Sequence, residues 1–213
     1  MSKSEFGFED NPAKPLCLEF ANTVSWHSSD TPKEKLTEYS ELVSWGIRVG
    51  LIGDSEGAAL FQESRRDLSR AARVHRRAIA LREAIYRIFR DVSDGRRPSS
   101  TDIDILNEAV SEAYGVLRIV GNESGFTWTM AGEKGLDVLL WPVAKSAADL
   151  LTRGELGRVR RCANDVEGCG WLFIDTTKNG NRRWCDMSDC GNRAKARRYY
   201  QRVKETRHTE GTN

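Results

Sequence analysis

Four of the five cysteines in this chain lie close together near its C-terminus. They are Cys162, Cys169, Cys185 and Cys190, in the pattern Cys-x6-Cys-x15-Cys-x4-Cys. Two pairs of thiolates are a usual donor set for a tetrahedral zinc ion, with zinc–sulfur distances of about 2.3 Å. The sequences between the members of each pair, which include NDVEG and DMSD, are rich in turn formers. The pattern therefore predicts one structural zinc ion per chain, with four protein ligands and no position left for water.

Two alternatives to a zinc site are disulfides and four unrelated thiols. Disulfides are disfavoured because the N-terminus shows no hydrophobic segment behind a basic start, and cytosolic thiols stay reduced. Unrelated thiols would not gather four of five cysteines into 29 positions. A segment this short cannot bury enough apolar surface to fold unaided, so the metal would stabilise it. Cys17, between two leucines, is expected to be a small buried hydrophobe.

The segment after Cys190 predicts a helix with two unlike kinds of surface. An apolar stripe, expected to pack on the zinc module, consists of Ala196, Tyr199, Tyr200 and Val203. Basic residues flank that stripe and continue into the region between the cysteine pairs. Lysine and arginine neutralise phosphates, while arginine and asparagine can read base edges. The residues predicted to contact nucleic acid are Arg182, Arg183, Asn192, Arg193, Lys195, Arg197, Arg198, Arg202 and Lys204.

The charge distribution supports a polyanionic partner for this end of the chain. Residues 153–207 carry 14 lysines and arginines against 7 acids, a net charge of +7, whereas the whole chain carries only +2. A merely solvated helix would interleave acids at i, i+4 spacing. Protein–protein contact is one alternative. RNA binding is another, since Trp171, Trp184, Tyr199 and Tyr200 could stack bases, although core packing is the preferred interpretation for Trp171 and Tyr200.

The periodicity of the remaining sequence predicts an α+β, mainly helical protein. Its expected parts are an N-terminal helical domain with one β-hairpin (1–155), a zinc-ribbon-like module ending in a basic helix (156–207) and a disordered tail (208–213). The hairpin would join residues 116–120 and 126–130. A second hairpin is expected between the cysteine pairs, from the strand-like WLFID and the turn at residues 178–181. A first helix is expected after Pro15, although a short strand is nearly as defensible there, and a second over residues 33–51, with Thr31-Pro32 as its cap and first-turn proline. Further helices are expected after a capping Asp54, over 67–92, and over 101–113 from a capping Thr101. The last is expected over 133–153, kinked or divided at Pro142.

Several stretches resemble known families. The sequence CGNR at 190–193, with CGWLFID, RRWCDM and RAKARRYYQR around it, is similar to the CGNR zinc-finger family. LCLEFANT at 16–23, ALREAIYRIF at 80–89 and WPVAKSAADLL at 141–151 resemble the ABATE domain. The resemblance implies a bacterial stress-induced transcription regulator, and it carries the family's metal ligands onto the four clustered cysteines. One departure is the six-residue gap between the first two cysteines, where four would be expected.

The function predicted from these features is a zinc-containing, DNA-binding transcription regulator that is not an enzyme. Its N-terminal domain would sense a small ligand, with Asn22, Trp26 and Arg82 as candidate ligand-binding residues, or would pair with a second chain as a homodimer. The alternative is that Asn22 caps a helix and Arg82 makes an internal ion pair. We expect a cytoplasmic protein, associated with the nucleoid when bound to DNA, because no apolar run reaches the length of a membrane span.

An enzyme acting on a small molecule in the N-terminal domain is the remaining alternative. That domain has no glycine-rich phosphate loop, no cysteine–histidine pair at motif spacing and no clustered acids of the metal-binding type. His27 and His75 are isolated in the sequence and are expected to be structural.

Overall fold

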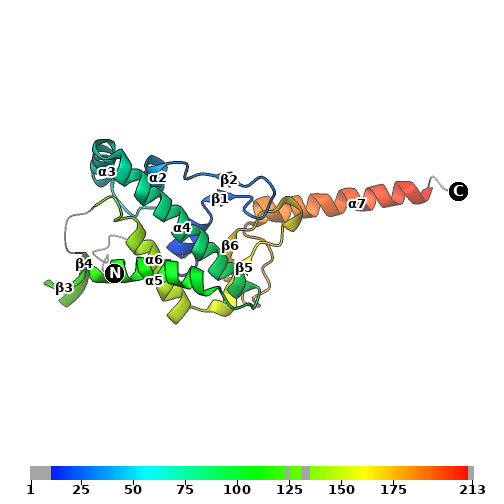
Figure 1. Cartoon of the computed structure of the whole chain (residues 1–213). Helices are drawn as coiled ribbons and strands as arrows, with labels where there is room; N and C mark the ends of the chain where they lie inside the picture. The colour runs from blue at the N-terminus through cyan, green and yellow to red at the C-terminus, as the bar shows by residue number, and fades with distance from the viewer. Residues whose placement is uncertain (1–10, 123–124, 131–134, 211–213) are drawn as a thin grey trace.

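A bundle of helices makes up the larger part of the computed structural model, which describes residues 11–122, 125–130 and 135–210. The long helix α4 lies at its centre and contacts α1, α2, α3 and α5, while α6 packs on α1 and α5 (Figure 1). The mainly helical fold class is confirmed. The helices of this part are α1 (Leu16–Ala21), α2 (Tyr39–Arg48), α3 (Asp54–Arg66), α4 (Leu68–Ser93), α5 (Ser100–Gly115) and α6 (Leu140–Arg153).

Helix α4 confirms the strongest periodicity in the sequence. It begins after Asp67, whose carboxylate accepts a hydrogen bond of 2.8 Å from the backbone N–H of Arg70. Such an N-cap satisfies an amide that has no partner within the helix. One face of α4 is buried in the core, and each large side chain on it contributes about 1.5–3 kcal/mol. Residues on that face include Ala78, Leu81, Ile85, Ile88 and Phe89.

Three short antiparallel hairpins complete the structure. The predicted hairpin is confirmed as β3 (Leu117–Asn122) and β4 (Gly125–Met130), which pairs Ile119 with Trp128 and projects from the end of the molecule opposite the C-terminus (Figure 1). Strands β1 (Val24–Ser25) and β2 (Lys33–Glu34) form a second hairpin beside α4. The third joins β5 (Val159–Arg161) to β6 (Leu172–Ile174).

The prediction of a helix over residues 33–51 was wrong at its start. Lys33 and Glu34 pair with β1 instead, and α2 begins only at Tyr39. The Glu34 carboxylate accepts hydrogen bonds from the backbone N–H groups of Lys35 and Leu36, at 2.9 and 2.7 Å. These side-chain-to-backbone bonds hold an extended turn and compete with helix formation. Pro32 is therefore not a first-turn proline.

The expected kink at Pro142 is also absent. Pro142 is the third residue of α6, in the first turn, where a backbone N–H would have no partner within the helix. The missing donor therefore costs nothing, and the proline neither bends nor divides α6. Residues 133 and 134, where this helix was expected to begin, lie outside the described residues.

Smaller differences concern the ends of three other helices. After Pro15, α1 ends at Ala21, so the following residues enter β1 rather than continuing the helix. Gly53 precedes α3, and Asp54 is its first residue rather than its cap. Ser99, not Thr101, caps α5, because its hydroxyl accepts the backbone N–H of Asp102 at 3.2 Å.

The C-terminal module consists of short elements and one long helix. They are η1 (Leu156–Arg158), β5, η2 (Asp165–Glu167), β6, η3 (Met187–Gly191) and α7 (Asn192–Glu210). The hairpin expected between the cysteine pairs was wrong, because β6 pairs with β5, upstream of the first cysteine, while residues 178–181 turn back without a partner strand. Val159, Leu172 and Ile174 belong to the same buried cluster as the body helices, so the β5–β6 ribbon is docked on the body.

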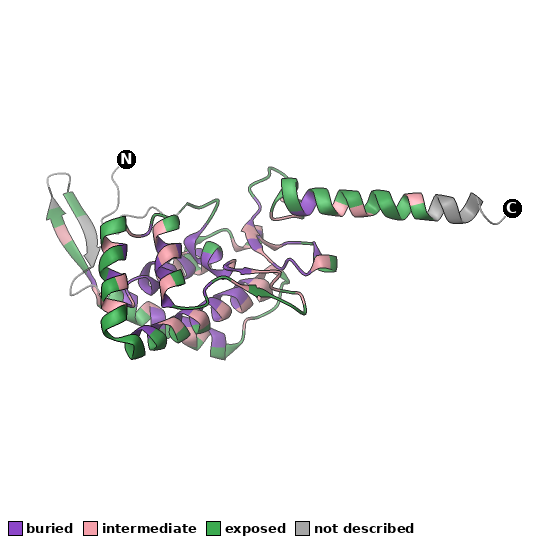
Figure 2. Ribbon diagram, turned by 90° about the horizontal axis from the view of Figure 1, so that it is seen from above, coloured by how far each residue is buried: buried purple, intermediate pink, exposed green. Residues whose placement is uncertain are grey.

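Helix α7 leaves the module as a rod that points away from the body (Figures 1 and 2). The predicted packing of its apolar stripe was wrong, since Tyr199 and Tyr200 are 58% and 70% exposed and Ala196 is also exposed. The reason is the direction of the helix axis, which lets only the first turns approach the rest of the module. The helix continues to Glu210, into the tail for which disorder was predicted, and residues 211–213 lie outside the described residues. Within the described residues, no helix has both the length and the apolarity needed to cross a membrane.

Candidate metal centre and nucleic-acid interface

The four clustered cysteines converge on one point. Their sulfur atoms all lie within 4.8 Å of one another, and the Sγ atoms of Cys169 and Cys190 are each 3.8 Å from that of Cys185. A tetrahedron with zinc–sulfur bonds of about 2.3 Å has edges of about 3.8 Å. None of the four is in a disulfide, and all except the half-buried Cys185 are buried. The cluster therefore fits one zinc ion, as predicted, and its four ligands leave no site for catalytic water.

The first metal-binding turn explains the long gap between Cys162 and Cys169. The extra residues form the single 3-10 turn η2, which ends at Gly168 with a φ of +65°. The backbone N–H of Cys169 then donates to the carbonyl of Asn164 at 3.1 Å. The Asn164 side chain, which is buried, donates to the Cys190 sulfur at 3.6 Å. Hydrogen bonds of this kind orient metal ligands, so Asn164 joins the two halves of the site.

The second metal-binding turn is held by side chains on both sides of Cys185. The Asp186 carboxylate accepts the backbone N–H groups of Ser188 and Asp189, at 2.6 and 3.1 Å, and so caps η3. The Ser188 hydroxyl also donates to this carboxylate at 2.6 Å, and that bond, together with the two backbone bonds, lowers the pKa of Asp186. Arg182 donates to the carbonyls of Trp184 and Cys185, and its guanidinium lies 4.7 Å from the centre of the Phe173 ring. Arg182 therefore stabilises the backbone on the N-terminal side of the second metal-binding turn.

The body of the protein holds the first metal-binding turn in place through backbone hydrogen bonds. The N–H groups of His27 and Ser28 donate to the carbonyls of Cys169 and Gly168, at 3.2 and 3.0 Å. A Cβ atom at Gly168 would lie only 2.5 Å from the backbone nitrogen of Ser29. Glycine is thus required at this position both by its positive φ and by the closeness of the neighbouring chain.

Replacing Gly168 with alanine is expected to destabilise the protein by roughly 1–3 kcal/mol, because the new methyl group meets backbone that cannot rotate away. Gly157→Ala is the matched control, since a Cβ there would meet nothing within 4 Å. The measurement is urea unfolding of both zinc-loaded variants. Equal midpoints for the two would show that the contact between the body and the first turn is not tight.

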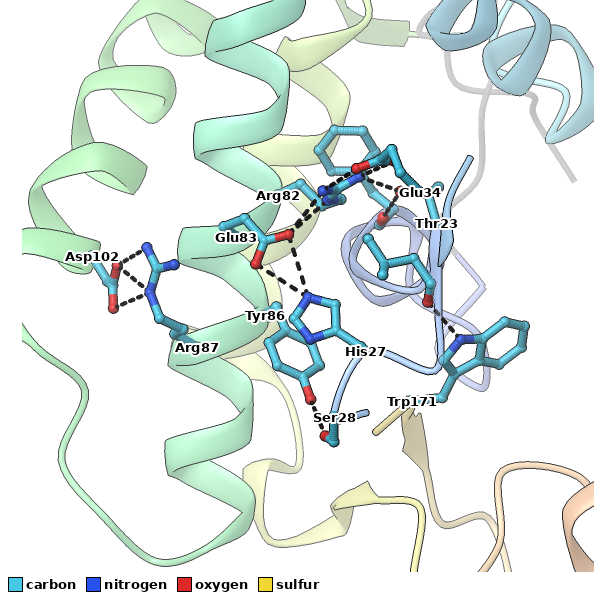
Figure 3. Close-up of polar contacts among 12 residues, drawn as sticks. Thr23, His27, Ser28, Glu34, Arg82, Glu83, Tyr86, Arg87, Asp102 and Trp171 are labelled. Atoms are coloured by element: carbon cyan, nitrogen blue, oxygen red, sulfur yellow. Dashed lines mark hydrogen bonds and ion pairs between the residues drawn. The ribbon is translucent and has the colours of Figure 1, made fainter. Parts of the chain in front are cut away.

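The three candidate ligand-binding residues lie in separate internal contacts. Asn22 follows α1 as its C-cap, and its amide exchanges two hydrogen bonds with the backbone of Leu172, at 2.8 and 2.9 Å. Trp26, with a φ of +56°, packs against the cysteine cluster. Arg82 is buried and pairs with Glu34 at 2.6 Å and Glu83 at 2.8 Å (Figure 3). The structure does not bring the three together around one cavity among the described residues, and their role in ligand binding stays a prediction.

A polar network extends from Arg82 to the zinc module. His27 Nε2 lies 3.1 Å from the Glu83 carboxylate, its ring stacks at 3.6 Å on Tyr86, and the Tyr86 hydroxyl lies 3.2 Å from that of Ser28 (Figure 3). Burial opposes ionisation of Glu83, but its contacts with His27 and Arg82 outweigh that and lower its pKa to about 2. Sequence reasoning missed Glu83 and Tyr86. Their partners His27 and Ser28 lie more than fifty residues away, and no spacing rule connects them.

Three of the predicted nucleic-acid residues are already engaged inside the protein. Arg182 braces the metal site. Arg193 pairs with Asp189 at 2.6 Å and with Glu167 at 3.2 Å, and Arg197 pairs with Glu167 at 2.7 Å. Glu167 was not predicted from the sequence, because an acid inside a turn gives no sign of partners in a later helix.

The other predicted residues lie on exposed parts of the module. Lys195, Arg198 and Arg202 share one face of α7 with Tyr199, at positions i, i+3, i+7 and i+4. Arg183 lies beside them, because its guanidinium and that of Arg198 both approach the Trp184 ring, at 5.3 and 5.9 Å from its centre. No carboxylate of the described residues pairs with Arg183, Lys195 or Arg198. We call Arg183, Lys195, Arg198 and Arg202 the outer basic face.

Two predicted residues stand apart from the outer basic face. Lys204 is exposed on the other flank of α7, in line with Arg193 and Arg197 along the helix. The Asn192 side chain donates to the carbonyl of Ser188 at 3.0 Å, so it closes η3 onto the start of α7. Contact of either residue with nucleic acid stays a prediction.

Comparison with protein families matches nearly the whole chain. Residues 14–154 match the ABATE family, described as "Putative stress-induced transcription regulator". Residues 158–203 match the CGNR zinc finger. No curated protein matches the sequence.

Proposed function

This chain belongs to the ABATE family and ends in a CGNR zinc finger, and we propose that it is a regulator of transcription that binds duplex DNA through the outer basic face. The observation that carries the proposal is the exposure of this face, three of whose four residues lie on α7, a helix that stands clear of the body (Figure 2). Both families are of regulator and zinc-finger type, which favours a binding role over an enzymatic one.

The dimensions and charge of α7 suit a major groove. A groove about 12 Å wide admits one α-helix, and a protruding helix can enter it without collision with the body. Lys195, Arg198 and Arg202 lie within one stripe, so they can follow one phosphate backbone. Arg183 extends this surface onto the zinc module. Each phosphate that such a residue neutralises releases counterions, which makes binding strongly salt-dependent.

The test is fluorescence anisotropy of a labelled mixed-sequence duplex over a salt series. Each lost phosphate contact removes roughly 0.9 from the log–log slope of affinity against salt, so the pair Lys195→Ala and Arg198→Ala should reduce it by about two. The matched control removes the same charge from exposed positions on α4, with Arg73→Ala and Arg76→Ala. Weak duplex binding that the Lys195/Arg198 variant leaves unchanged would defeat the proposal.

Single-stranded nucleic acid is the second candidate, and one observation favours it. Tyr199 and Tyr200 are exposed as an edge-to-face pair with centroids 5.7 Å apart. Exposed aromatic rings can stack unpaired bases, at roughly 1–3 kcal/mol per base. The same titrations with RNA and single-stranded DNA separate the two candidates. Tighter binding of a single strand, lost in Tyr199→Ala but kept for duplex, would favour this alternative.

The proposal includes control of DNA binding by the N-terminal domain, through a small ligand or a second copy of the chain. What supports it is the position of Asn22 and Trp26, which contact the zinc module directly. A ligand that displaced either side chain would disturb the contact between the N-terminal domain and the zinc module from which α7 extends. Selection of bound fragments from genomic DNA, with full-length protein and with Asn22→Ala, would show whether this contact affects site choice.

A further inference from the structure

We infer that Glu167 and Trp26 clamp Arg193 and Arg197 and thereby fix the direction in which α7 leaves the zinc module. We call these four residues the α7 clamp. The inference deepens the proposed function, because it separates the basic residues of α7 into positioning residues and residues that face the nucleic acid. Only its DNA-binding test rests on the proposed function.

Glu167 is the centre of the α7 clamp. Its two carboxylate oxygens accept from Arg197 at 2.7 Å and from Arg193 at 3.2 Å, and the Asn164 side chain donates to it at 3.2 Å. One carboxylate thus ties two successive turns of α7 to the first metal-binding turn.

Trp26 holds the same helix from the body of the protein. Its ring lies 5.1 Å from the Arg193 guanidinium, within the range of a cation–π contact. Trp26 is the single described non-glycine residue with a positive φ, +56°, and such a conformation persists only where the surroundings enforce it. Here the enforcement comes from His27 and Ser28, whose backbone N–H groups bond to Cys169 and Gly168. Body, metal site and α7 therefore meet at the clamp.

The clamp also explains which face of α7 is presented outward. Arg193 and Arg197 are one turn apart, on the flank that faces η2. Lys195 lies two residues from each of them, which on a helix corresponds to roughly 200°, so it is on the opposite flank, and Arg198 lies one turn further on, at i+3 from Lys195. Because Glu167 pairs with Arg193 and Arg197, the residues that remain available to contact phosphates are those of the outer basic face. Losing Glu167 would release two further arginines and let the helix change direction.

The first test measures the direction of α7 in the zinc-loaded full chain without DNA. Spin labels are attached through a genetically encoded ketone amino acid at the exposed Arg76 on α4 and Gln201 on α7, which spares the cysteines. We expect a narrow distance distribution in the otherwise unaltered chain and a broad or displaced one after Glu167→Ala or Trp26→Ala. Asp165→Asn is the matched control, since it removes an acid from the same turn that pairs with Arg161 and not with α7.

A positioning role is separated from a loss of fold by two further readouts. Zinc content should be unchanged in Glu167→Ala. The Arg193→Ala/Arg197→Ala variant should broaden the distribution as much as Glu167→Ala, and combining all three changes should add little, because they remove one interaction. A distribution that stays narrow in Glu167→Ala, or zinc lost from that variant, would overturn the clamp.

The second test measures duplex DNA binding, where removal of Glu167 is expected to increase the salt dependence rather than reduce it. If two released arginines reach phosphates, the salt slope of Glu167→Ala should increase by up to about two, whereas Asp165→Asn should leave it unchanged. A smaller slope would overturn the assignment of Arg193 and Arg197 as positioning residues. A broadened distance distribution without DNA binding in any variant would refute the proposed function and leave the clamp supported.

Discussion

Replacing Cys190 with serine is expected to abolish stoichiometric zinc binding and to unfold the two metal-binding turns. A structural zinc site in a small module contributes about 10–16 kcal/mol of binding free energy, which is also folding free energy. Three remaining thiolates cannot complete the tetrahedron that the sulfur distances of 3.8 Å define. Metal analysis by mass spectrometry should fall from one equivalent to a small fraction.

In the same variant, α7 should lose its attachment to the module while the β5–β6 ribbon stays ordered. Cys190 lies in η3, directly before α7, so the helix loses its attachment. The β5–β6 ribbon should stay protected, because Val159 and Leu172 are buried in the core of the body. Hydrogen exchange followed by mass spectrometry measures both regions at once. Cys17→Ala is the control: Cys17 is buried far along the chain from the cluster, and its loss should leave the zinc content at one equivalent.

Full zinc occupancy in Cys190→Ser would refute the four-cysteine site. Full occupancy in Cys17→Ala together with loss in Cys190→Ser would support it. A loss of zinc in both variants would instead mean that metal binding depends on the fold of the body. The separation of the two outcomes is possible because Cys17 and Cys190 lie in different buried clusters.

The sequence predicted those parts of the fold whose signals are local. Helix α4 has both a capping aspartate and a regular apolar face, and the β3–β4 hairpin has alternation and glycines in its loop. The four thiols identify a metal site because few other arrangements need them. The body's helical class and the ligand set of the zinc site could therefore be predicted without coordinates.

The parts that could not be predicted depend on partners far apart in the chain. Glu34 meets Arg82 across 48 positions, and residues 33 and 34 pair with β1 rather than joining α2. Glu167 meets Arg197 across 30 positions, which decides that a residue expected at a phosphate is paired internally. The amphipathic pattern of α7 predicts that its apolar stripe packs on the zinc module, yet Tyr199 in that stripe is exposed. Periodicity indicates that a helix has an apolar side, and it does not say what covers that side.

Replacing Arg82 with alanine is expected to destabilise the protein by about 3 kcal/mol, at the lower end of the range for removing one partner of a buried ion pair. The Arg82 side chain is 3% exposed and pairs with both Glu34 and Glu83, so its loss would leave Glu34 without its arginine and Glu83 with His27 alone. Both carboxylates are partly exposed to solvent, which keeps the cost from being larger. Arg77→Ala is the matched control on the same helix, because its pair with Glu112 is exposed on both sides and should contribute at most about 1 kcal/mol.

Urea unfolding of the zinc-loaded chain at neutral pH gives both values, and their difference carries the argument. A large cost for Arg82→Ala alone would mean that this arginine serves the fold by joining β2 to α4. Equal, small costs would contradict that role. Arg82 would then be retained by something other than stability, and the ligand-binding role predicted from the sequence would become the better explanation, testable by the response of the same variant to candidate small molecules.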